Sequence, residues 1–376
     1  MENKILRFCP SPFIRFEVQL TEHCNLNCRN CMHYAPLAKP EFLNVDLYEK
    51  DLNRLSELFS GEAEWIRLMG GEPLLHPEIN YIIRITRKNF PYGKIRIVSN
   101  GILIPLMKDE FWNECKHNNI EICMTKYPIE IDYFELIDKI EHHGVTASMY
   151  SGSDRSPTMW RFPIDTMGDF DPVFNFYHCE KANVCLTLKQ GRLFPCATSA
   201  HAHHLINFFH LPICSSKRNG VDIYSVRDAE ELMQKVATPK PFCRYCDYSN
   251  VSDYEDDWSV SNRFLYDWVS FTFSNTDMEF LSNASDIYIY GAGNWGKRVL
   301  KRIRDAGIPV KNVLVSKTSD NPSMFGNIKV IEITSIEEVD EEAICIIAVE
   351  GKEKKEIQHK LVEHGFKKII PLFQMK

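Results

Sequence analysis

The chain has 376 residues, a formal net charge of -7, 44% hydrophobic residues and 25% charged residues. This length predicts two or three domains with packed cores, and the mild negative charge without long one-sign runs excludes nucleic acid as the main partner. No run of about eighteen apolar residues and no apolar signal-peptide core occur, so we expect no membrane partner and a cytoplasmic location.

The first 150 residues alternate short β-rich runs with amphipathic helical segments. In the segment 46–59, for example, Tyr48, Leu52, Leu55 and Phe59 fall on one helical face. Repeated strand–helix units predict a parallel sheet with right-handed crossovers, in which functional residues gather at the C-terminal strand ends. Strands are predicted at 13–21, 65–69, 94–99, 120–126 and 145–150, and helices at 46–59, after Pro77, at 105–117 and at 131–143.

The middle of the chain has a different character. From 151 to 255 the strand–helix alternation stops, and cysteine, histidine, glycine and proline become more frequent. A hairpin is predicted over 186–189 and 192–194, with Gly191 in its turn. Residues 256–284 are expected to form an aromatic-rich helical connection.

A new βαβ pattern begins at residue 286 and runs to the end. A strand at 287–290 leads through a G-x-G-x-x-G turn, formed by Gly291, Gly293 and Gly296, into a helix at 297–306. This is the context of a dinucleotide-binding turn. The acidic residue expected after the strand 313–315 is absent, which argues against standard recognition of the NAD ribose. Further elements are predicted at 343–349, 352–365 and 368–372.

This C-terminal segment resembles the small Rossmann-like domains attached to sugar-modifying enzymes of polysaccharide gene clusters. The resemblance suggests a nucleotide or nucleotide-sugar site at the three glycines. A docking or dimerisation domain that binds nothing is the open alternative.

The thirteen cysteines are unusual for a chain without a secretion signal. Cys24, Cys28 and Cys31 form C-x3-C-x2-C directly after the first predicted strand. Three thiolates in one loop suit a [4Fe–4S] cluster that leaves one iron open for another ligand. A zinc site with His23 or His33 as fourth ligand is the alternative, but it leaves the later glycine motif unexplained.

The cysteine triplet and the later Gly70-Gly71-Glu72-Pro73 resemble the paired motifs of radical S-adenosylmethionine (SAM) enzymes. The resemblance implies a partial (β/α)6 barrel in which the amino and carboxylate groups of SAM chelate the open iron. It implies reductive cleavage of SAM to methionine and a 5′-deoxyadenosyl radical, with an electron donor such as flavodoxin or ferredoxin.

The same resemblance assigns SAM contacts residue by residue. The glycines let the backbone approach the methionine moiety, and Glu72 pairs with its ammonium. Asn30 stands where the family often has an aromatic residue before the third cysteine, so adenine packing is assigned to another side chain. The remaining assignments are Ser99 and Asn100 for the ribose and carboxylate, Lys126 for the carboxylate, and Tyr34 for the adenine.

A second cysteine group has the pattern C-x11-G-x4-C followed by C-x2-C. It resembles the "twitch" auxiliary-cluster domains that follow some radical SAM barrels, which implies a second, fully ligated [4Fe–4S] cluster. Structural zinc suits four thiolates equally well and stays open. Cys185 is an alternative to Cys179 as the first ligand, but it would shorten the spacing between the first cysteine and the glycine. The implied ligands are Cys179, Cys196, Cys243 and Cys246.

These resemblances predict three domains and one favoured function. The predicted domains are the barrel at 10–155, the auxiliary-cluster domain at 156–255 and, after a linker at 256–284, the Rossmann-like domain at 285–376. A fully ligated cluster passes electrons, so we expect oxidation of a sugar or nucleotide-linked sugar, as in the radical SAM dehydrogenases of aminoglycoside biosynthesis. If Cys123 instead returns a hydrogen atom from the opposite face, the outcome is epimerisation.

Two other functions stay open. A peptide- or protein-modifying radical SAM enzyme is disfavoured by the dozen or so residues before the first strand. A non-enzymatic iron–sulfur redox or binding protein is disfavoured by the intact triplet. No ligand role is expected for His201, His203 or His204, because a loop histidine near cysteine ligands more often forms supporting hydrogen bonds.

Overall fold

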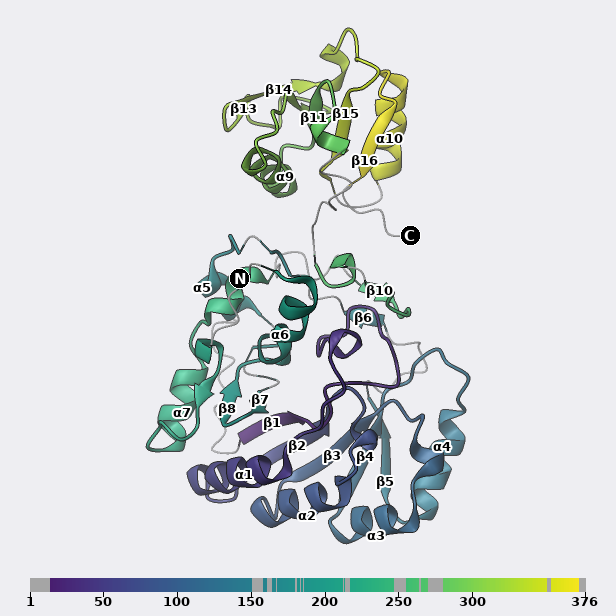
Figure 1. The fold of residues 1–376 in the computed structure, drawn as a ribbon, viewed down its shortest axis with the longest axis vertical. Helices are drawn as coiled ribbons and strands as arrows, with labels where there is room; N and C mark the ends of the chain where they lie inside the picture. The colour runs from purple at the N-terminus through teal and green to yellow at the C-terminus, as the bar shows by residue number, and fades with distance from the viewer. Residues whose placement is uncertain are drawn as a thin grey trace. The chain divides into compact units, whose positions relative to one another are not determined.

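The chain folds into two compact units, Met1–Ser270 and Phe271–Lys376 (Figure 1). The rival ligand Cys185 lies outside the described residues. No helix in the described part of the chain is long and apolar enough to cross a bilayer. The computed structural model describes residues 14–150, 158–160, 164–166, 168–179, 181, 182, 184, 186–211, 213, 217–246, 255–263, 265–269, 280–349 and 353–371.

An open eight-stranded sheet forms the centre of the first unit, in the order β5-β4-β3-β2-β1-β7-β8-β9. Neighbouring strands from β5 to β7 are parallel, whereas β7, β8 and β9 are antiparallel. The predicted α/β class with a partial barrel is therefore confirmed. The strands are β1 Ile14–Gln19, β2 Ala63–Met69, β3 Lys94–Ser99, β4 Ile120–Met124, β5 Thr146–Met149, β7 Thr187–Lys189, β8 Arg192–Phe194 and β9 Val221–Asp222.

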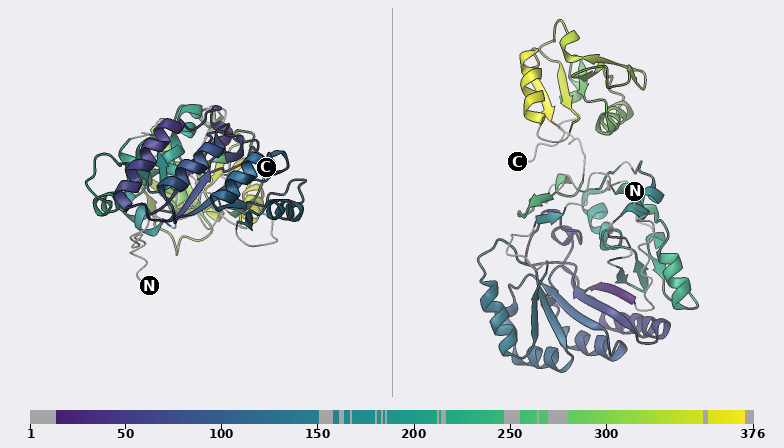
Figure 2. Two further views of the ribbon diagram at one scale, coloured as in Figure 1. Left: turned by 90° about the horizontal axis from the view of Figure 1, so that it is seen from below. Right: turned by 180° about the vertical axis from the view of Figure 1, so that it is seen from behind.

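Four helices cover one face of this sheet, as the ribbon seen from front and back shows (Figures 1 and 2). The side chain of Asn44 caps the first helix by accepting a hydrogen bond from Leu47 N at 3.0 Å. The helix predicted to begin at Pro105 starts later. Pro105 lies in a short 3-10 turn, and the helix begins at Asp109, where acidic residues favour a helix N-terminus. The helices are α1 Val45–Phe59, α2 Ile79–Asn89, α3 Asp109–His117 and α4 Tyr133–His142.

Alternation along the strands gives the sheet two chemically different faces. Ile95 and Ile97 of β3, for example, join the apolar core beneath the helices. The opposite side, which we call the inner face, carries charged and polar side chains. Its members include Glu17, Gln19, Arg67, Arg96, Glu121, Cys123 and Ser148.

The predicted hairpin forms β7 and β8, with Gly191 in the turn at φ 70°. β7 pairs in parallel with β1 and so extends the sheet of the first 150 residues into this segment, a pairing that the sequence pattern did not predict. The helix α6 Ala197–Phe209 was not expected, since histidines occupy buried positions that a sequence pattern assigns to apolar residues. The other elements here are α5 Pro172–His178, α7 Ala229–Val236, the 3-10 turns η5 Pro241–Tyr245 and η7 Leu265–Asp267, and the pair β6 Thr158–Trp160 and β10 Glu255–Asp257.

A second apolar core lies between α6 and the cysteine-rich segments. Its buried members come from five stretches of sequence, so it joins parts of the chain that are far apart. The helical connection predicted over 256–284 is wrong at its start, because β10 is a strand that pairs with β6. The core consists of Tyr34, Leu37, Ile164, Ala202, Leu205, Ile213, Phe242, Trp268 and Val269.

The second unit is a small α/β sheet in the order β13-β14-β12-β11-β15-β16. Its five parallel strands, numbered along the chain, lie in the order 3-2-1-4-5, as in a Rossmann-type sheet. The predicted βαβ pattern is therefore present. The elements are β11 Ile287–Tyr290, α9 Asn294–Asp305, β12 Asn312–Val315, β13 Met324–Phe325, β14 Ile328–Glu332, β15 Ile344–Ile347, α10 Lys354–Glu363 and β16 Lys368–Pro371.

Candidate functional site

The loop that carries the cysteine triplet leaves β1 and packs directly on the glycines that follow β2. Gly71 N donates to Thr21 O at 2.8 Å, and Glu72 N donates to His23 O at 3.1 Å. A Cβ on Gly71 would lie 1.8 Å from His23 O, which is far inside van der Waals contact. Glycine is therefore required here by the cysteine loop itself, in addition to the SAM contact that the sequence predicts.

Glu72 joins this loop to the end of β3. Its carboxylate is fully buried and accepts hydrogen bonds from Ser99 Oγ at 2.8 Å, Asn100 N at 3.0 Å and Leu74 N at 3.2 Å. Burial raises the pKa of Glu72 to about 7, although these hydrogen bonds act in the opposite direction. Pro73 begins the short 3-10 turn that follows. The pairing of Glu72 with a SAM ammonium stays a prediction.

Asn100 connects the third motif to the first cysteine. Its Nδ2 donates to Asn25 Oδ1 at 2.7 Å and lies 3.7 Å from Cys24 Sγ, while its Oδ1 accepts from Ile102 N at 3.0 Å. The cysteine loop, the glycine motif and the Ser99-Asn100 motif thus meet at the C-terminal ends of neighbouring strands, as the sequence predicts.

The three thiols of the triplet are free and close enough to affect one another. Burial raises the pKa of Cys24, and burial together with nearby Cys31 raises the pKa of Cys28 to about 12. Burial also acts to raise the pKa of Cys31, but the hydrogen bond and charge of His33 outweigh it and lower this pKa. In this group burial opposes the ionisation of the thiols. Such a group fits a cationic metal centre, because the positive charge of the metal stabilises the thiolates.

The second cysteine group is assembled from three separate segments. Cys179 ends α5, Cys196 begins α6, and Cys243 and Cys246 lie in and after η5. Burial and then Cys179 raise the pKa of Cys196 to about 12, and burial with Cys179 raises the pKa of Cys243 to about 11. Asn175 Nδ2 donates to the carbonyls of Cys243 at 2.8 Å and Cys246 at 2.6 Å. This thiol set suits a metal centre with four protein ligands.

The two cysteine groups border the same apolar core. Trp268 Nε1 donates to Cys31 O at 3.1 Å, and Trp268 O accepts from Ile164 N at 3.0 Å. Ile164 forms an antiparallel bridge with Cys246. Tyr34 is buried in this core, and burial followed by Cys246, Cys196 and Cys31 raises its pKa. Tyr34 therefore packs between the two groups, and its contact with adenine stays a prediction.

Two further predicted residues lie in and just beyond β4. Cys123 is buried and belongs to the inner face, since its strand neighbours Ile122 and Met124 join the core beneath the helices whereas it does not. Lys126 lies two residues beyond the end of β4 and is half-buried. Their predicted roles toward a substrate and toward SAM stay predictions.

In the second unit the three glycines differ in their surroundings. Gly291 has φ 117°, and a Cβ there would lie 2.8 Å from Ala348 O. A Cβ on Gly296 would lie 2.0 Å from Gly291 O, so both positions require glycine for the turn itself. Gly293 begins α9 and has no other atom within 4 Å of an added Cβ, which leaves open space at the helix N-terminus.

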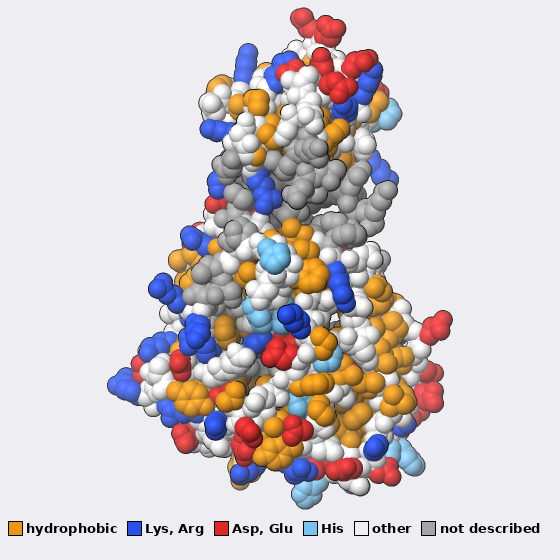
Figure 3. Space-filling model, in the orientation of Figure 1, with side chains coloured by type: hydrophobic (Ala, Val, Ile, Leu, Met, Phe, Trp, Pro, Cys, Tyr) orange, Lys and Arg blue, Asp and Glu red, His pale blue; other side chains and the backbone are white. Residues whose placement is uncertain are grey.

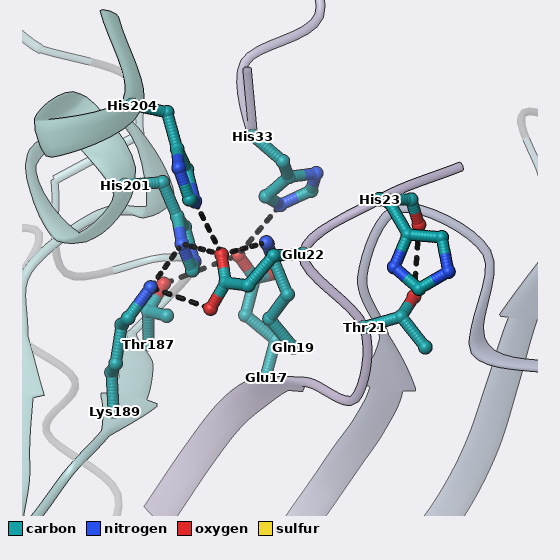
Figure 4. A network of polar contacts seen from close by, with 10 residues as sticks. All are labelled: Glu17, Gln19, Thr21, Glu22, His23, His33, Thr187, Lys189, His201 and His204. Carbon is teal, nitrogen blue, oxygen red and sulfur yellow. Dashed lines mark hydrogen bonds and ion pairs between the residues drawn. The ribbon is translucent and has the colours of Figure 1, made fainter. Parts of the chain in front are cut away.

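Sequence reasoning missed a buried polar network that joins β1, β7 and α6 (Figure 4). At its centre is Glu22, whose carboxylate accepts from Lys189 Nζ at 2.7 Å, Gln19 Nε2 at 2.7 Å and His204 Nε2 at 2.6 Å. The only sequence signal was the histidine cluster of α6, in which His201 and His204 are both buried. Glu22 and Lys189 are distant in sequence, and no motif connects them.

The comparisons with known proteins concern mainly the parallel sheet. The family model described as the Radical SAM superfamily matches residues 18–146. GTP 3′,8-cyclase of Stenotrophomonas maltophilia (strain K279a) is 35% identical over 97 residues, which are 25% of this chain and 28% of that protein. Molybdenum cofactor biosynthesis protein 1 of Dictyostelium discoideum is 36% identical over 88 residues, which are 23% of this chain and 14% of that protein. The matches thus span less than a third of these relatives.

Two solved structures resemble the chain at low identity. BtrN in complex with AdoMet and 2-DOIA is 15% identical with a TM-score of 0.37, covering 68% of this chain and 99% of that one. anSMEcpe with bound AdoMet is 12% identical with a TM-score of 0.40, covering 65% of this chain and 92% of that one. At these values the likeness carries no conclusion about activity or substrate.

A parallel α/β sheet whose first strand leads into a three-cysteine loop, packed on a Gly-Gly-Glu-Pro turn, defines a class of iron–sulfur enzyme. Residues 18–146 of the chain form a radical SAM domain, which begins within β1 and ends at the start of β5. Members of this superfamily use a [4Fe–4S] cluster and SAM.

Proposed function

We propose that this protein is a radical SAM oxidoreductase that abstracts a hydrogen atom from a sugar or a nucleotide-linked sugar. The observation that carries the proposal is the joining of the two cysteine groups through one core, from Cys31 through Trp268 and Ile164 to Cys246. When bound, a cluster and SAM at the triplet supply a 5′-deoxyadenosyl radical, and a second cluster accepts one electron.

The protein's residues have distinct tasks in this proposal. Cys24, Cys28 and Cys31 would hold the first cluster. The four thiols of the second group would ligate all four irons of the second cluster, so none of its irons would be open to another ligand. The Glu72 hydrogen bonds keep the glycine turn and the Ser99-Asn100 turn in register with the cysteine loop. Such positioning matters because a displacement of about 1 Å can cost roughly 100-fold in rate.

The inner face supports a polyhydroxylated substrate. Its charges are already paired, with Arg67 4.0 Å from Glu17 and Arg96 3.0 Å from Glu121. The guanidinium of Arg67 also lies 4.2 Å from the centre of the Trp65 ring. Paired charges and aromatic rings give the inner face many hydrogen-bonding groups without excess charge. Such a surface suits a substrate with many hydroxyl groups better than a substrate with apolar side chains.

Two outcomes remain for the substrate radical. Loss of a hydroxyl proton and one electron gives a ketone, and the second cysteine group is the natural electron acceptor. Return of a hydrogen atom from the thiol of Cys123 gives an inverted centre and leaves a thiyl radical, which needs one electron from the reductant and one proton to restore the thiol; the inner-face position of Cys123 supports this role. The dehydrogenase outcome alone gives the second cysteine group an electron to accept.

The second unit would supply a nucleotide site for a nucleotide-linked sugar. The strand order, the required glycines at Gly291 and Gly296, and the open space beside Gly293 support a phosphate at the N-terminus of α9. Gly293→Ala should leave the fold intact because its Cβ meets nothing. If a phosphate binds there, the same change should weaken the binding of UDP-glucose measured by calorimetry, whereas equal binding or no binding would exclude this site.

Anaerobic reconstitution tests the core of the proposal. The intact protein should bind about eight irons per chain and release 5′-deoxyadenosine with SAM and dithionite. Cys28→Ala should abolish this release, whereas Cys243→Ala should lower the iron content but retain SAM cleavage. About four irons in the unmodified protein would remove the second cluster from the proposal.

The products separate the outcomes. A carbonyl product without solvent deuterium indicates a dehydrogenase, and an inverted carbon carrying solvent deuterium indicates an epimerase that Cys123→Ser should inactivate. GTP belongs in the substrate panel, because the curated relatives named above include a GTP 3′,8-cyclase. Consumption of GTP alone, with no sugar turned over, would contradict the proposed substrate class.

A further inference from the structure

Three side chains of the kinds that bind metal ions converge in the network around Glu22. One carboxylate oxygen of Glu22 and one ring nitrogen each of His203 and His204 all lie within 4.8 Å of one another. Nε2 of His204 is 2.6 Å from Oε2 of Glu22 (Figure 4), and the ring centres of His203 and His204 are 3.9 Å apart. The three ligand atoms are therefore close enough to share one ion.

The spacing of these atoms fits a tetrahedral ion after small movements. Zinc lies about 2.0–2.2 Å from imidazole nitrogen and carboxylate oxygen, so two of its ligand atoms are roughly 3.4 Å apart. The 2.6 Å contact between His204 and Glu22 would open by about 0.8 Å, and the widest separation would close by at most about 1.4 Å (4.8 minus 3.4). Small rotations of the three side chains cover changes of this size.

An accessible cleft leads to two of the three ligands. It has a volume of about 840 Å³, and Glu22 and His203 both line it. His204 is 9% exposed, and its Nε2 reaches the same carboxylate. In the space-filling view, histidine, lysine and acidic side chains gather where Figure 1 draws α6 above β7 (Figure 3). An ion from solution therefore has a route to these ligands.

Neighbouring groups hold two of the ligands in place. Gln19 Nε2 donates to Glu22 Oε2 at 2.7 Å, and the backbone of Ala200 is hydrogen-bonded to the His203 ring. Metal-binding imidazoles usually have such a hydrogen bond at one nitrogen, because it fixes the orientation of the ring and leaves the other nitrogen for the ion.

Lys189 contacts the other oxygen of the carboxylate. Its Nζ donates to Glu22 Oε1 at 2.7 Å, whereas His204 contacts Oε2. A carboxylate has acceptor positions on both oxygens, so an ammonium group and an ion can share it. The two positive charges repel each other, and removal of the lysine charge should therefore strengthen the binding of the ion.

The ligand types favour zinc among the common divalent ions. Mg²⁺ and Ca²⁺ prefer oxygen ligands, whereas imidazole suits zinc and the transition metals. Three ligands drawn from histidine and glutamate, with a fourth position open, are typical of zinc sites that bind a further molecule.

The spacing along the chain does not indicate this site. His203 and His204 are adjacent in α6, and Glu22 is 182 residues away from His204. The expectation of no ligand role for these histidines treated them as loop residues, whereas the structure places both in a helix that packs against the carboxylate.

We propose that Glu22, His203 and His204 form a zinc site that is separate from both cysteine groups. Its fourth position would take an oxygen ligand from the cleft, such as water or a hydroxyl group. This proposal goes beyond the proposed function, because it adds a metal centre that does not depend on the identity of the substrate.

Anaerobic dialysis of the reconstituted holoenzyme measures zinc binding without turnover. The protein is equilibrated with a graded series of free Zn²⁺ concentrations, and zinc and iron are measured by mass spectrometry in the same sample. We expect about one zinc per chain with no loss of iron, and no competition from Mg²⁺. No uptake of zinc, or uptake only with a matching loss of iron, would overturn the proposal.

Substitutions of the ligands locate the ion. His203→Asn changes a half-buried residue and should weaken zinc binding about 100-fold or more, since even the groups that support metal ligands contribute about 10–100-fold. Glu22→Gln should weaken binding at least as much. Glu41→Gln, at another carboxylate of the cleft, and His210→Asn, at an exposed histidine ending α6, are the matched controls and should stay within about threefold of the unmodified protein. Thermal unfolding checks that each variant is folded.

Lys189→Met tests the placement of the ion beside the carboxylate. Methionine keeps an apolar stem but removes the charge, so zinc binding should tighten by at least about threefold. Weaker binding by this variant would contradict a second cation on Glu22 and would overturn the proposal.

X-ray absorption at the zinc edge identifies the ligand atoms. Zinc at the proposed site should have nitrogen and oxygen neighbours at about 2.0–2.2 Å, whereas zinc bound by either cysteine group has sulfur neighbours at about 2.3 Å. Sulfur neighbours would overturn the proposal, as would equal zinc affinity of His203→Asn and the unmodified protein.

This experiment fails separately from that of the proposed function. Zinc that is bound by the unmodified protein and lost in His203→Asn establishes the site even if no sugar is oxidised or epimerised. A protein that turns over a sugar but takes up no zinc refutes the site and leaves the proposed activity intact.

Discussion

Replacement of Gly71 by alanine is the sharpest test of how the cysteine loop is positioned. The added Cβ would lie 1.8 Å from His23 O, 2.2 Å from His23 C and 2.8 Å from Cys24 N. Ordinary contact begins at 3.4 Å, so the shortest distance is 1.6 Å too small (3.4 minus 1.8). The obstructing atoms belong to backbone, which cannot rotate away as a side chain can.

The loop must therefore move by more than 1 Å relative to the glycine turn. Such a shift breaks the hydrogen bonds from Gly71 N to Thr21 O and from Glu72 N to His23 O. Two lost hydrogen bonds and the residual strain should lower the free energy of unfolding by about 2–4 kcal/mol. Because the shift moves Cys24 relative to the SAM-binding turn, SAM cleavage should fall by roughly 100-fold or more.

Gly293→Ala is the control, since its Cβ meets no atom within 4 Å and should change stability by less than about 0.5 kcal/mol. Chemical denaturation of the apoprotein measures stability, and reconstitution followed by chromatography of 5′-deoxyadenosine measures cleavage. A Gly71→Ala protein that unfolds like the control and cleaves SAM within twofold of the unmodified rate would refute the steric argument.

Three further substitutions test other parts of the site. Burial raises the pKa of Glu72 from 4.5 to about 7, so the folded state retains a proton there that the unfolded state loses, and stability should fall as pH rises through this window. Glu72→Gln should flatten that slope in thermal unfolding between about pH 5 and about pH 7, and an unchanged slope would contradict the assignment. Asn175→Ala removes two hydrogen bonds to the carbonyls of the second cysteine pair and should lower bound iron from about eight toward about four per chain. Iron and 5′-deoxyadenosine are measured on one sample, and joint loss of both would count against separate centres. Asp51→Ala removes the acceptor of Gly191 N at 2.7 Å and of the Tyr224 hydroxyl at 2.8 Å, and should lower the unfolding free energy by about 1–3 kcal/mol in urea denaturation; an unchanged midpoint would show that these bonds do not stabilise the hairpin turn.

Local sequence patterns were sufficient to predict the parallel sheet and to predict that its three motifs meet at one edge. Strand alternation and helical periodicity act over a few residues, and parallel strands necessarily bring their C-terminal ends to one edge. The contacts of Asn100 with Asn25 and of Ser99 with Glu72 follow from that topology. The spacing of Cys24, Cys28 and Cys31 itself indicated the metal chemistry, because these three thiols lie in one loop.

Other features depended on contacts between distant parts of the chain. The pairing of β7 with β1, the burial of Tyr34 in the core between the cysteine groups, and the network around Glu22 join residues separated by more than a hundred positions. No local pattern encodes such a pair, because each partner alone resembles an ordinary charged or aromatic residue. Only the folded chain brings Lys189 and His201 to the same carboxylate, and burial there gives them hydrogen-bonding roles that an exposed side chain would lack.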